Sequence, residues 1–215
     1  DQIKMKKAVL FDLDGTLWDS GETVISAWND ALIAQGLEKY TKTVSDMHSY
    51  MGKTLPVIAE MLLPDIPEKE RMKIIGKCCK EEAKRLAVTG GKLYPELENT
   101  LKKLSEKYFL GIISNCQNGY IETFFNVHGL GYLFSDTECN GGTGLSKGEN
   151  IALVIKRNNI DKAVYVGDTI LDMQAADEAG VPFIHAAYGF GKPDRETEKI
   201  ASISEILTVA DKMLN

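Results

Sequence analysis

Apolar residues follow two different patterns along the chain, and these patterns predict two kinds of structure. From about Ser20 to Ala87 they recur at helical spacing, which places them on one face of each helix. The first apolar face contains Val24, Ile25, Trp28, Leu32 and Ile33. Further helices are predicted at Val44–Met51, Leu55–Leu63 and Glu68–Ala87, with Pro64 and Pro67 separating the last two. No strand is expected in this stretch, so we predict a wholly helical segment.

After Pro95, predicted helices and strands alternate. The strands are expected at Phe109–Ser114, Tyr132–Ser135, Ala163–Gly167 and Pro182–His185. The helices are expected at Leu97–Lys107, Gly119–His128, Lys147–Asn158 and Leu171–Ala179. A first strand at Lys7–Asp12 belongs with this set, and Thr89–Lys92 is interpreted as a flexible connection. Repeated strand–helix units form a parallel sheet with helices on both faces. We therefore predict an α/β fold with a doubly wound parallel sheet.

The helical segment separates the first strand from the others, which predicts an insertion into the α/β fold. We expect a core domain made of residues 1–17 and 88–215, and an inserted α-helical domain made of residues 18–87. With 215 residues, the chain is long enough to bury a core and to carry such an insertion.

Charge and composition exclude several classes of partner. The net charge of −6 comes without a long basic run, so we expect no nucleic acid partner. No apolar stretch approaches the roughly 20 residues that span a bilayer, so we expect no membrane partner. The early lysines precede only a short apolar strand, unlike a signal peptide. We expect a cytoplasmic protein, and the sequence leaves monomer and homodimer open.

Cysteines, histidines and the glycine-rich run do not indicate a further site. The four cysteines contain no C-x-x-C pair and the three histidines are scattered, so zinc is not expected and reduced thiols are. Cys116 is interpreted as a bystander. The run from Gly141 to Gly144 lacks the order of a phosphate-binding loop and is interpreted as a turn.

The first predicted strand ends on two carboxylates, Asp12 and Asp14, followed by Gly15. Desolvating an anion costs several kcal/mol unless a cation or hydrogen-bond donors compensate it. A bound Mg²⁺ with oxygen ligands would provide that compensation. An activated carboxylate nucleophile with an acid/base partner would use both side chains. The alternative is a strand followed by an ordinary Asp-Gly turn.

Other strands bring polar residues to the same edge. Ser114 and Asn115 end the second strand, and Asp168 ends a later one, with Asp172 four residues further on at a helix start. Ligands of doubly wound sheets bind at the carboxyl ends of the strands. A single aspartate at a helix start is explained equally well as a helix cap with no further role. Four aspartates that converge on one edge of the sheet indicate a site.

Lys147 is predicted in the first turn of a helix, because Ser146 and Glu149 have the spacing of a capping box. A cation is electrostatically misplaced at a helix N-terminus. Its position is understandable if Lys147 reaches the carboxylates and a phosphate. The alternative is a solvated surface lysine.

These residues resemble the motifs of the haloacid dehalogenase superfamily of hydrolases, in its phosphatase branch. Phe11–Leu17 matches the first motif, DxDGT, and Ser114 with Asn115 matches the second. Lys147 matches the third motif and Gly167–Asp172 the fourth. The four occur in family order and span nearly the whole chain. Within this branch the chain looks like the phosphoglycolate-phosphatase-type proteins, in which a Rossmann-like core carries a small helical cap.

The resemblance implies a Mg²⁺-dependent phosphatase that forms an aspartyl-phosphate. Asp12 would attack phosphorus, and Asp14 would protonate the leaving oxygen and then take a proton from water. The carboxylates of Asp12 and Asp168 and the backbone carbonyl of Asp14 would bind Mg²⁺, with Asp172 supporting them. The expected substrate is a small phosphorylated metabolite, either phosphoglycolate-like or a sugar phosphate.

The resemblance also implies which residues would bind substrate. Phosphoryl oxygens would be bound by Gly15, Thr16, Ser114, Asn115 and Lys147, with backbone N–H groups near Gly15 and Asn115 completing the charge stabilisation. From the cap, His48 and Lys53 are expected to touch the non-phosphate part. An ordinary surface turn at those two residues stays open.

Asp14 favours phosphoryl transfer over dehalogenation. A dehalogenase needs no acid two residues after its nucleophile, and that branch resembles DxYGT. A phosphomutase of the same fold, β-phosphoglucomutase-like, is the first alternative. A non-catalytic binding protein is the second, and the intact set of Asp12, Asp14, Lys147 and Asp168 argues against it.

Overall fold

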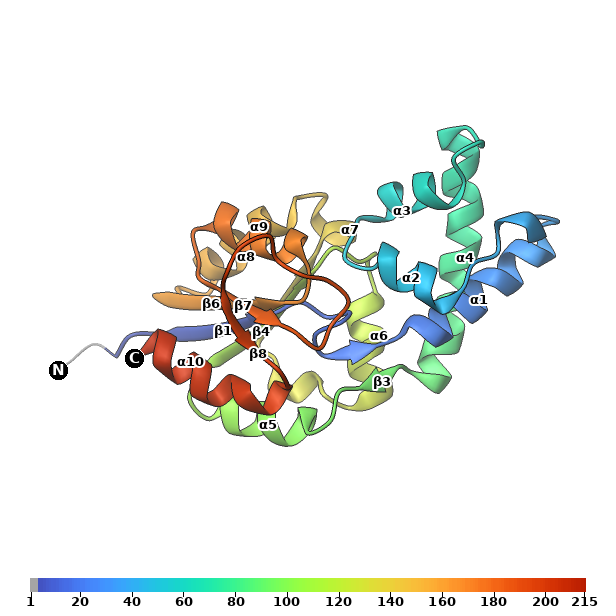
Figure 1. The fold of residues 1–215 in the computed structure, drawn as a ribbon. Coiled ribbons are helices and arrows are strands. Elements are labelled where there is room, and N and C mark those ends of the chain that lie inside the picture. The colour runs from blue at the N-terminus through green and yellow to red at the C-terminus, as the bar shows by residue number, and fades with distance from the viewer. Residues whose placement is uncertain (1–3) are drawn as a thin grey trace.

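The computed structural model describes residues 4–215 and contains a six-stranded sheet with helices around it, from which a helical part extends to one side (Figure 1). The strand order is β5-β4-β1-β6-β7-β8, and every pair in this sheet is parallel. The strands are β1 (Lys7–Phe11), β4 (Phe109–Ser114), β5 (Asp136–Cys139), β6 (Lys162–Gly167), β7 (Phe183–Ala186) and β8 (Glu198–Ile200). The predicted doubly wound α/β fold is confirmed.

Both faces of the sheet are covered, which explains the continuous apolar run of β1. Val9 and Phe11 join one buried cluster, and Ala8 and Leu10 join another, because neighbouring strand residues point to opposite faces. Helices α5 (Leu97–Ser105) and α10 (Ile206–Leu214) supply the first cluster. Helices α8 (Lys147–Arg157) and α9 (Ile170–Ala179) supply the second.

A helical insertion follows β1, as predicted, and projects to one side of the sheet (Figure 1). Its helices are α1 (Gly21–Ala34), α2 (Val44–Tyr50), α3 (Leu55–Leu62) and α4 (Glu68–Thr89). Two short antiparallel strands, β2 (Trp18–Asp19) and β3 (Lys92–Leu93), connect it to the rest of the chain. Helix α4 packs against α6 (Tyr120–His128), so the insertion contacts the core directly.

The structure corrects the prediction of a strand at Tyr132–Ser135. Gly131–Leu133 forms a 3-10 turn instead, and β5 begins at Asp136. The apolar residues of this segment pack on the core cluster, with Leu133 buried and Phe134 against it. Strand β5 has only β4 beside it, and an edge strand can carry polar residues. Strand β5 therefore contains too few apolar residues to be predicted from the sequence.

Two other features differ from the sequence prediction, whereas the turn expected at the glycine-rich run agrees with it. Thr89–Lys92 is an ordered connection, because Thr89 ends α4 and Lys92 begins β3. Strand β8 and helix α10 were not predicted. The glycine-rich run lies in a short helical turn, α7 (Asn140–Thr143), and ends at Gly144.

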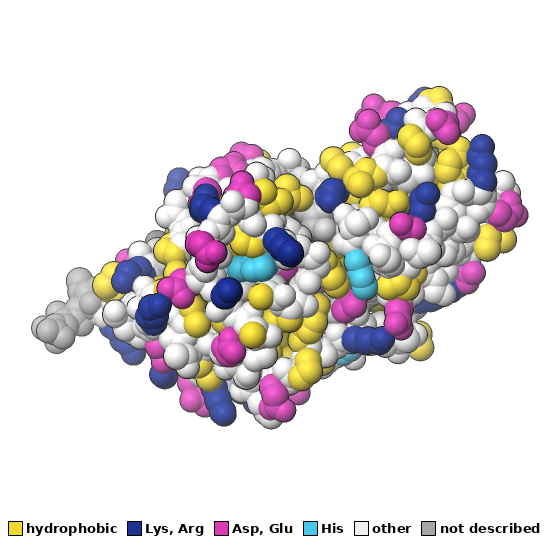
Figure 2. Space-filling model, in the orientation of Figure 1, with side chains coloured by type: hydrophobic (Ala, Val, Ile, Leu, Met, Phe, Trp, Pro, Cys, Tyr) yellow, Lys and Arg dark blue, Asp and Glu magenta, His cyan; other side chains and the backbone are white. Residues whose placement is uncertain are grey.

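The surface agrees with the mixed charge of the sequence. Acidic and basic side chains are interspersed over the face seen in Figure 2, and neither sign covers a continuous area there. Among residues 4–215, no helix combines the length and apolar character needed to cross a membrane.

Candidate active site

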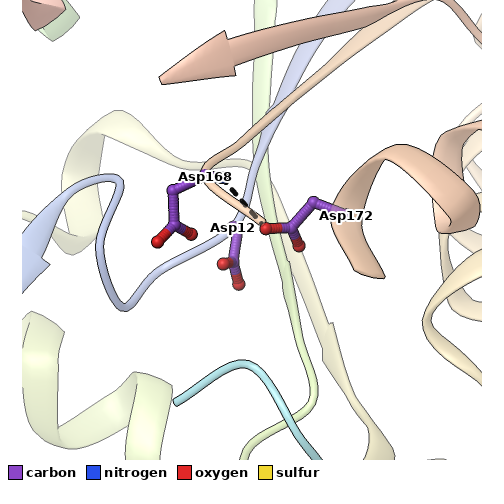
Figure 3. A group of neighbouring side chains, drawn as sticks. All are labelled: Asp12, Asp168 and Asp172. Carbon is purple, nitrogen blue, oxygen red and sulfur yellow. Dashed lines mark hydrogen bonds between the residues drawn. The ribbon is translucent and has the colours of Figure 1, made fainter. Parts of the chain in front are cut away.

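Three buried aspartates meet at the carboxyl ends of β1 and β6. Asp12 follows β1, Asp168 follows β6, and Asp172 lies in the first turn of α9 (Figure 3). One oxygen from each carboxyl group lies within 4.8 Å of the others. The topology therefore brings together residues that are more than 150 positions apart, at the edge where such sheets bind ligands.

Hydrogen bonds fix Asp172 beside Asp168. The backbone N–H groups of Asp168 and Thr169 both donate to Oδ2 of Asp172, each at 3.0 Å. Thr169 and Asp172 also form a capping box at the start of α9. Asp172 therefore does act as a helix cap, which was the alternative to a role in a site. Its other oxygen, Oδ1, remains available to the cluster.

Lys147 reaches the aspartates from the start of α8, where the predicted capping box of Ser146 and Glu149 is present. Its Nζ lies 2.6 Å from Oδ1 of Asp172 and 3.3 Å from Oδ1 of Asp12. Burial opposes the charge on the ammonium group, but the two carboxylates raise the pKa of Lys147 above its usual value. Lys147 is thus a buried ion-pair partner and not a surface lysine.

The cluster holds more negative than positive charge. Burial, with Asp172 nearby, raises the pKa of Asp12 well above its usual value, and burial raises the pKa of Asp168 to about 7. Oδ2 of Asp12 is buried and has no hydrogen-bond partner among the described residues. The cluster thus has several carboxylate oxygens, one of them without a hydrogen-bond partner, and too little positive charge to balance them. These features fit a hard divalent cation such as Mg²⁺.

Asp14 lies close to the cluster but is held separately from it. Its Oδ1 accepts hydrogen bonds from the hydroxyl of Tyr120 at 2.6 Å, Nε1 of Trp18 at 2.9 Å and the hydroxyl of Ser20 at 3.2 Å. Burial raises the pKa of Asp14, and these three donors oppose the rise. The two aspartates of the first motif therefore have different surroundings: Asp12 contacts a cation, and Asp14 contacts neutral donors.

Gly15 permits the close approach of Asp168. Its φ is +79°, a region that favours glycine, and a Cβ at this position would lie 2.1 Å from Oδ2 of Asp168. The same oxygen accepts a 2.8 Å hydrogen bond from the backbone N–H of Phe190. Oδ1 of Asp168 accepts a weaker bond from the hydroxyl of Thr16 at 3.5 Å. Gly15 and Thr16 thus support the carboxylate of Asp168.

A cavity lies between the sheet edge and the helical insertion. Asp12, Asp14, Ser114 and Asn115 line it from the core. From the insertion it is lined by Val24, Trp28, Met47, Met51, Gly52, Lys53, Leu55, Ile58 and Glu82. Nδ2 of Asn115 donates to the carbonyl of Gly52 at 3.0 Å, so this wall of the cavity is joined across the two parts.

Of the two cap residues predicted to touch substrate, the structure places only one at the cavity. Lys53 lines it, with Nζ donating to the carbonyl of Ser49 at 2.8 Å. His48 is not among the lining residues. Its Nε2 lies 3.0 Å from Oδ1 of Asp19, and its ring stacks on Phe190 with the centroids 4.3 Å apart. His48 thus contacts the core beside the cavity and not inside it.

Sequence reasoning missed three polar residues of the cavity: Tyr120, Gln117 and Glu82. Tyr120 and Gln117 follow Asn115 without matching a motif. Glu82 had a signal in its spacing, because it follows Ile75 and Cys78 and precedes Leu86 on the one buried face of α4. A charged residue on such a face is unusual and indicates a specific partner.

Comparisons with known proteins agree with this geometry. The model of the haloacid dehalogenase-like hydrolase family matches residues 9–186. The phosphoglycolate phosphatase of Aquifex aeolicus (strain VF5) is 31% identical over 192 residues, which cover 86% of this chain and 87% of that protein.

Solved structures show the same fold. A predicted phosphoglycolate phosphatase from Haemophilus somnus 129pt superposes with a TM-score of 0.82 at 21% identity, covering 96% of this chain and 99% of that one. A 2-haloacid dehalogenase from Pseudomonas syringae pv. Tomato DC3000 superposes with a TM-score of 0.66 at 21% identity, covering 97% and 99%. The fold alone therefore does not choose the reaction. The match over residues 9–186, with the 31% identical relative, shows that this chain belongs to the haloacid dehalogenase-like hydrolase family.

Proposed function

We propose that the protein is a Mg²⁺-dependent phosphatase that hydrolyses a small phosphorylated metabolite through an aspartyl-phosphate on Asp12. The observation that carries this proposal is the different surroundings of Asp12 and Asp14 at one cavity. Asp12 lies 3.3 Å from Lys147, whereas Asp14 is held by three neutral donors. These surroundings support a role as nucleophile for Asp12 and a role in proton transfer for Asp14.

Asp12 would form the covalent intermediate. Lys147 favours its ionised form and would offset the repulsion between this carboxylate and a phosphate dianion. Attack on phosphorus forms the Asp12–phosphorus bond and breaks the bond to the leaving oxygen. Hydrolysis of that intermediate then restores the carboxylate and releases phosphate.

Asp14 would serve as acid and then as base. Its raised pKa favours a carboxyl group that can carry a proton to the leaving oxygen. Afterwards the carboxylate takes a proton from the attacking water. Because three donors hold Oδ1, the other oxygen is the one free to exchange the proton.

The residues of the cluster can hold the metal. We assign the carboxylates of Asp12 and Asp168 and the backbone carbonyl of Asp14 as its ligands, with Asp172 supporting them. When bound, Mg²⁺ would neutralise charge that develops on the transferred phosphoryl group. Ser114, Lys147 and the backbone N–H groups near Gly15 and Asn115 would bind the phosphoryl oxygens.

The helical insertion, which we assign as residues 18–87, would cover the site and select the leaving group. It supplies more than half of the residues that line the cavity, including Lys53. Enclosure by such a lid excludes water and strengthens electrostatic interactions. The relatives' name makes phosphoglycolate a candidate substrate, and sugar phosphates form the other candidate class.

Hydrolysis of an aryl phosphate tests the proposal without knowledge of the natural substrate. We expect Mg²⁺-dependent turnover by the wild type and none by Asp12→Asn. The circular dichroism spectrum of this variant should match that of the wild type, which shows that the fold is kept. Asp65→Asn makes the same chemical change at an exposed position and should keep full activity. Turnover by Asp12→Asn with full metal dependence would show that the proposed mechanism is wrong.

A further inference from the structure

Glu82 is a buried carboxyl group that the proposed mechanism does not use. It lies on α4, 3% exposed, and lines the same cavity as Asp12 and Asp14. A buried acidic residue costs free energy unless its oxygens find partners. Burial raises the pKa of Glu82 to about 8. Its position on the buried face of α4 therefore needs an explanation in terms of the groups that it contacts.

Glu82 is bonded from both sides of the cavity. One oxygen accepts a hydrogen bond from Nε1 of Trp28 in the insertion at 3.0 Å. The other accepts one from the side-chain amide of Gln117 in the core. A carboxyl group has about four lone-pair positions, so two hydrogen bonds do not exhaust it. The group is held in one orientation with hydrogen-bonding capacity left for a ligand.

The other side chains of the insertion that line the cavity are mostly apolar. Val24, Met47, Leu55 and Ile58 are among them. Of the described lining residues, Lys53 is the single cation from the insertion, and its Nζ is bonded to a backbone carbonyl. A carboxylate on the leaving group would therefore add a negative charge to a cavity that already holds the carboxyl groups of Asp12, Asp14 and Glu82.

A hydroxyl group fits this position better than a carboxylate does. A hydroxyl both donates and accepts, so it can pair with Glu82 whether or not that side chain carries a proton. A carboxylate only accepts, so it could pair only with the protonated form. The apolar residues around Glu82 would pack against the carbon atoms of a small alcohol.

We propose that Glu82 is a specificity-determining residue that hydrogen-bonds a hydroxyl of the leaving group, so that the preferred substrates are phosphate esters of small polyols or sugars and not of hydroxy acids. This inference rests on the proposed phosphatase function and names the substrate class of that site. A site built to bond a hydroxyl discriminates strongly against analogues that lack it, because its buried polar group is then left unpaired.

Three esters of similar size test the inference: glycerol 3-phosphate carries hydroxyl groups, phosphoglycolate a carboxylate, and ethyl phosphate neither. We expect wild-type kcat/KM to be highest for glycerol 3-phosphate. The amide of Gln has one acceptor oxygen for the two donors, Trp28 and Gln117, so it cannot keep the orientation of the carboxyl group. Glu82→Gln should therefore lower that value by about tenfold or more and change the value for phosphoglycolate by less than about threefold. Glu70→Gln, at an exposed position on the same helix, is the matched control and should keep the wild-type order.

A second variant separates recognition from packing. Glu82→Gln combined with Gln117→Glu keeps one carboxyl group and one amide in contact but moves the carboxyl group to the core side. We expect this exchange to recover part of the preference for glycerol 3-phosphate. Thermal unfolding of each variant shows whether the fold persists.

The outcomes distinguish the two proposals. Equal losses on all three esters, or a wild type that prefers phosphoglycolate, would overturn the role of Glu82 while leaving the phosphatase intact. Absence of wild-type hydrolysis of every ester, an aryl phosphate included, would overturn the proposed function and this inference with it.

Discussion

The hydroxyl of Tyr120 donates a 2.6 Å hydrogen bond to Oδ1 of Asp14, although 106 positions separate the two residues in the chain. Tyr120 lies at the start of α6, on the core, and Asp14 follows β1. The bond therefore ties the proposed acid/base residue to a second element of the core. It also helps to keep Oδ1 of this carboxylate fixed, together with the bonds from Trp18 and Ser20.

Tyr120→Phe should lower turnover without unfolding the protein. Loss of a hydrogen bond to a charged group costs about 1.5–3 kcal/mol, and Trp18 and Ser20 still hold Asp14. We expect kcat for an aryl phosphate to fall about tenfold or more. Tyr132→Phe removes a hydroxyl that bonds Glu98 on the surface and serves as the control. An unchanged kcat would show that this bond does not position Asp14.

Gly15→Ala should abolish activity by displacing Asp168. The new Cβ would lie 2.1 Å from Oδ2 of Asp168, in addition to the strain of φ +79°. Gly36→Ala is a matched control, because Gly36 has φ +72° but a Cβ there would meet no atom within 4 Å. This variant therefore measures the backbone strain alone, which is about 1–2 kcal/mol. Activity assays and Mg²⁺ binding by calorimetry compare the two. Equal effects would argue against the role assigned to the contact with Asp168.

Lys147→Met should destabilise the protein. Removal of one partner of a buried ion pair leaves an uncompensated charge and costs about 3–5 kcal/mol, and Lys147 contacts both Asp12 and Asp172. We expect a lower unfolding midpoint in urea without metal, and partial recovery on addition of Mg²⁺. Lys156→Met alters an exposed lysine on the same helix and should have little effect. Similar midpoints for both variants would contradict the prediction.

The stability of the wild type should fall as pH rises, in part because of Glu82. Its pKa is raised from 4.5 to about 8 in the folded protein, so between these values the folded state binds a proton that the unfolded state has released. The free energy of unfolding then decreases as pH rises from about 4.5 to about 8. The side chain of the Glu82→Gln variant cannot titrate, so this variant should lack the contribution of Glu82 to the pH dependence. Over the whole range that contribution to the free energy of unfolding is about a few kcal/mol.

Urea unfolding of the wild type and Glu82→Gln across this pH range measures the difference. Asp12 and Asp168 also have raised pKa values and contribute to both curves, so the comparison isolates Glu82. Curves that run parallel would show that Glu82 does not take up a proton on folding.

The sequence was sufficient for four of the six strands of the sheet, the insertion and the charged cluster, since each follows a periodic pattern or a short motif. Asp12, Lys147 and Asp168 are each recognisable from the few residues around them. Glu82 and Tyr120 are not, because their partners come from other elements and only the packing of α4 against α6 brings them to the cavity. Strand β5 was missed for a related reason: at an edge of the sheet it does not need an apolar run.

The paired strands β2 and β3 have a consequence for how such a protein can diversify. Because Trp18 lies beside Leu93 and Asp19 beside Lys92, the polypeptide leaves the core and returns to it at a single place. The residues between Ser20 and Lys92 could be exchanged for another segment without a change in the register of β1 against β4 and β6, or in the hydrogen bonds that Trp18 and Ser20 donate to Asp14. The fold therefore allows the inserted segment to change while the aspartate cluster at the carboxyl ends of β1 and β6 keeps its arrangement.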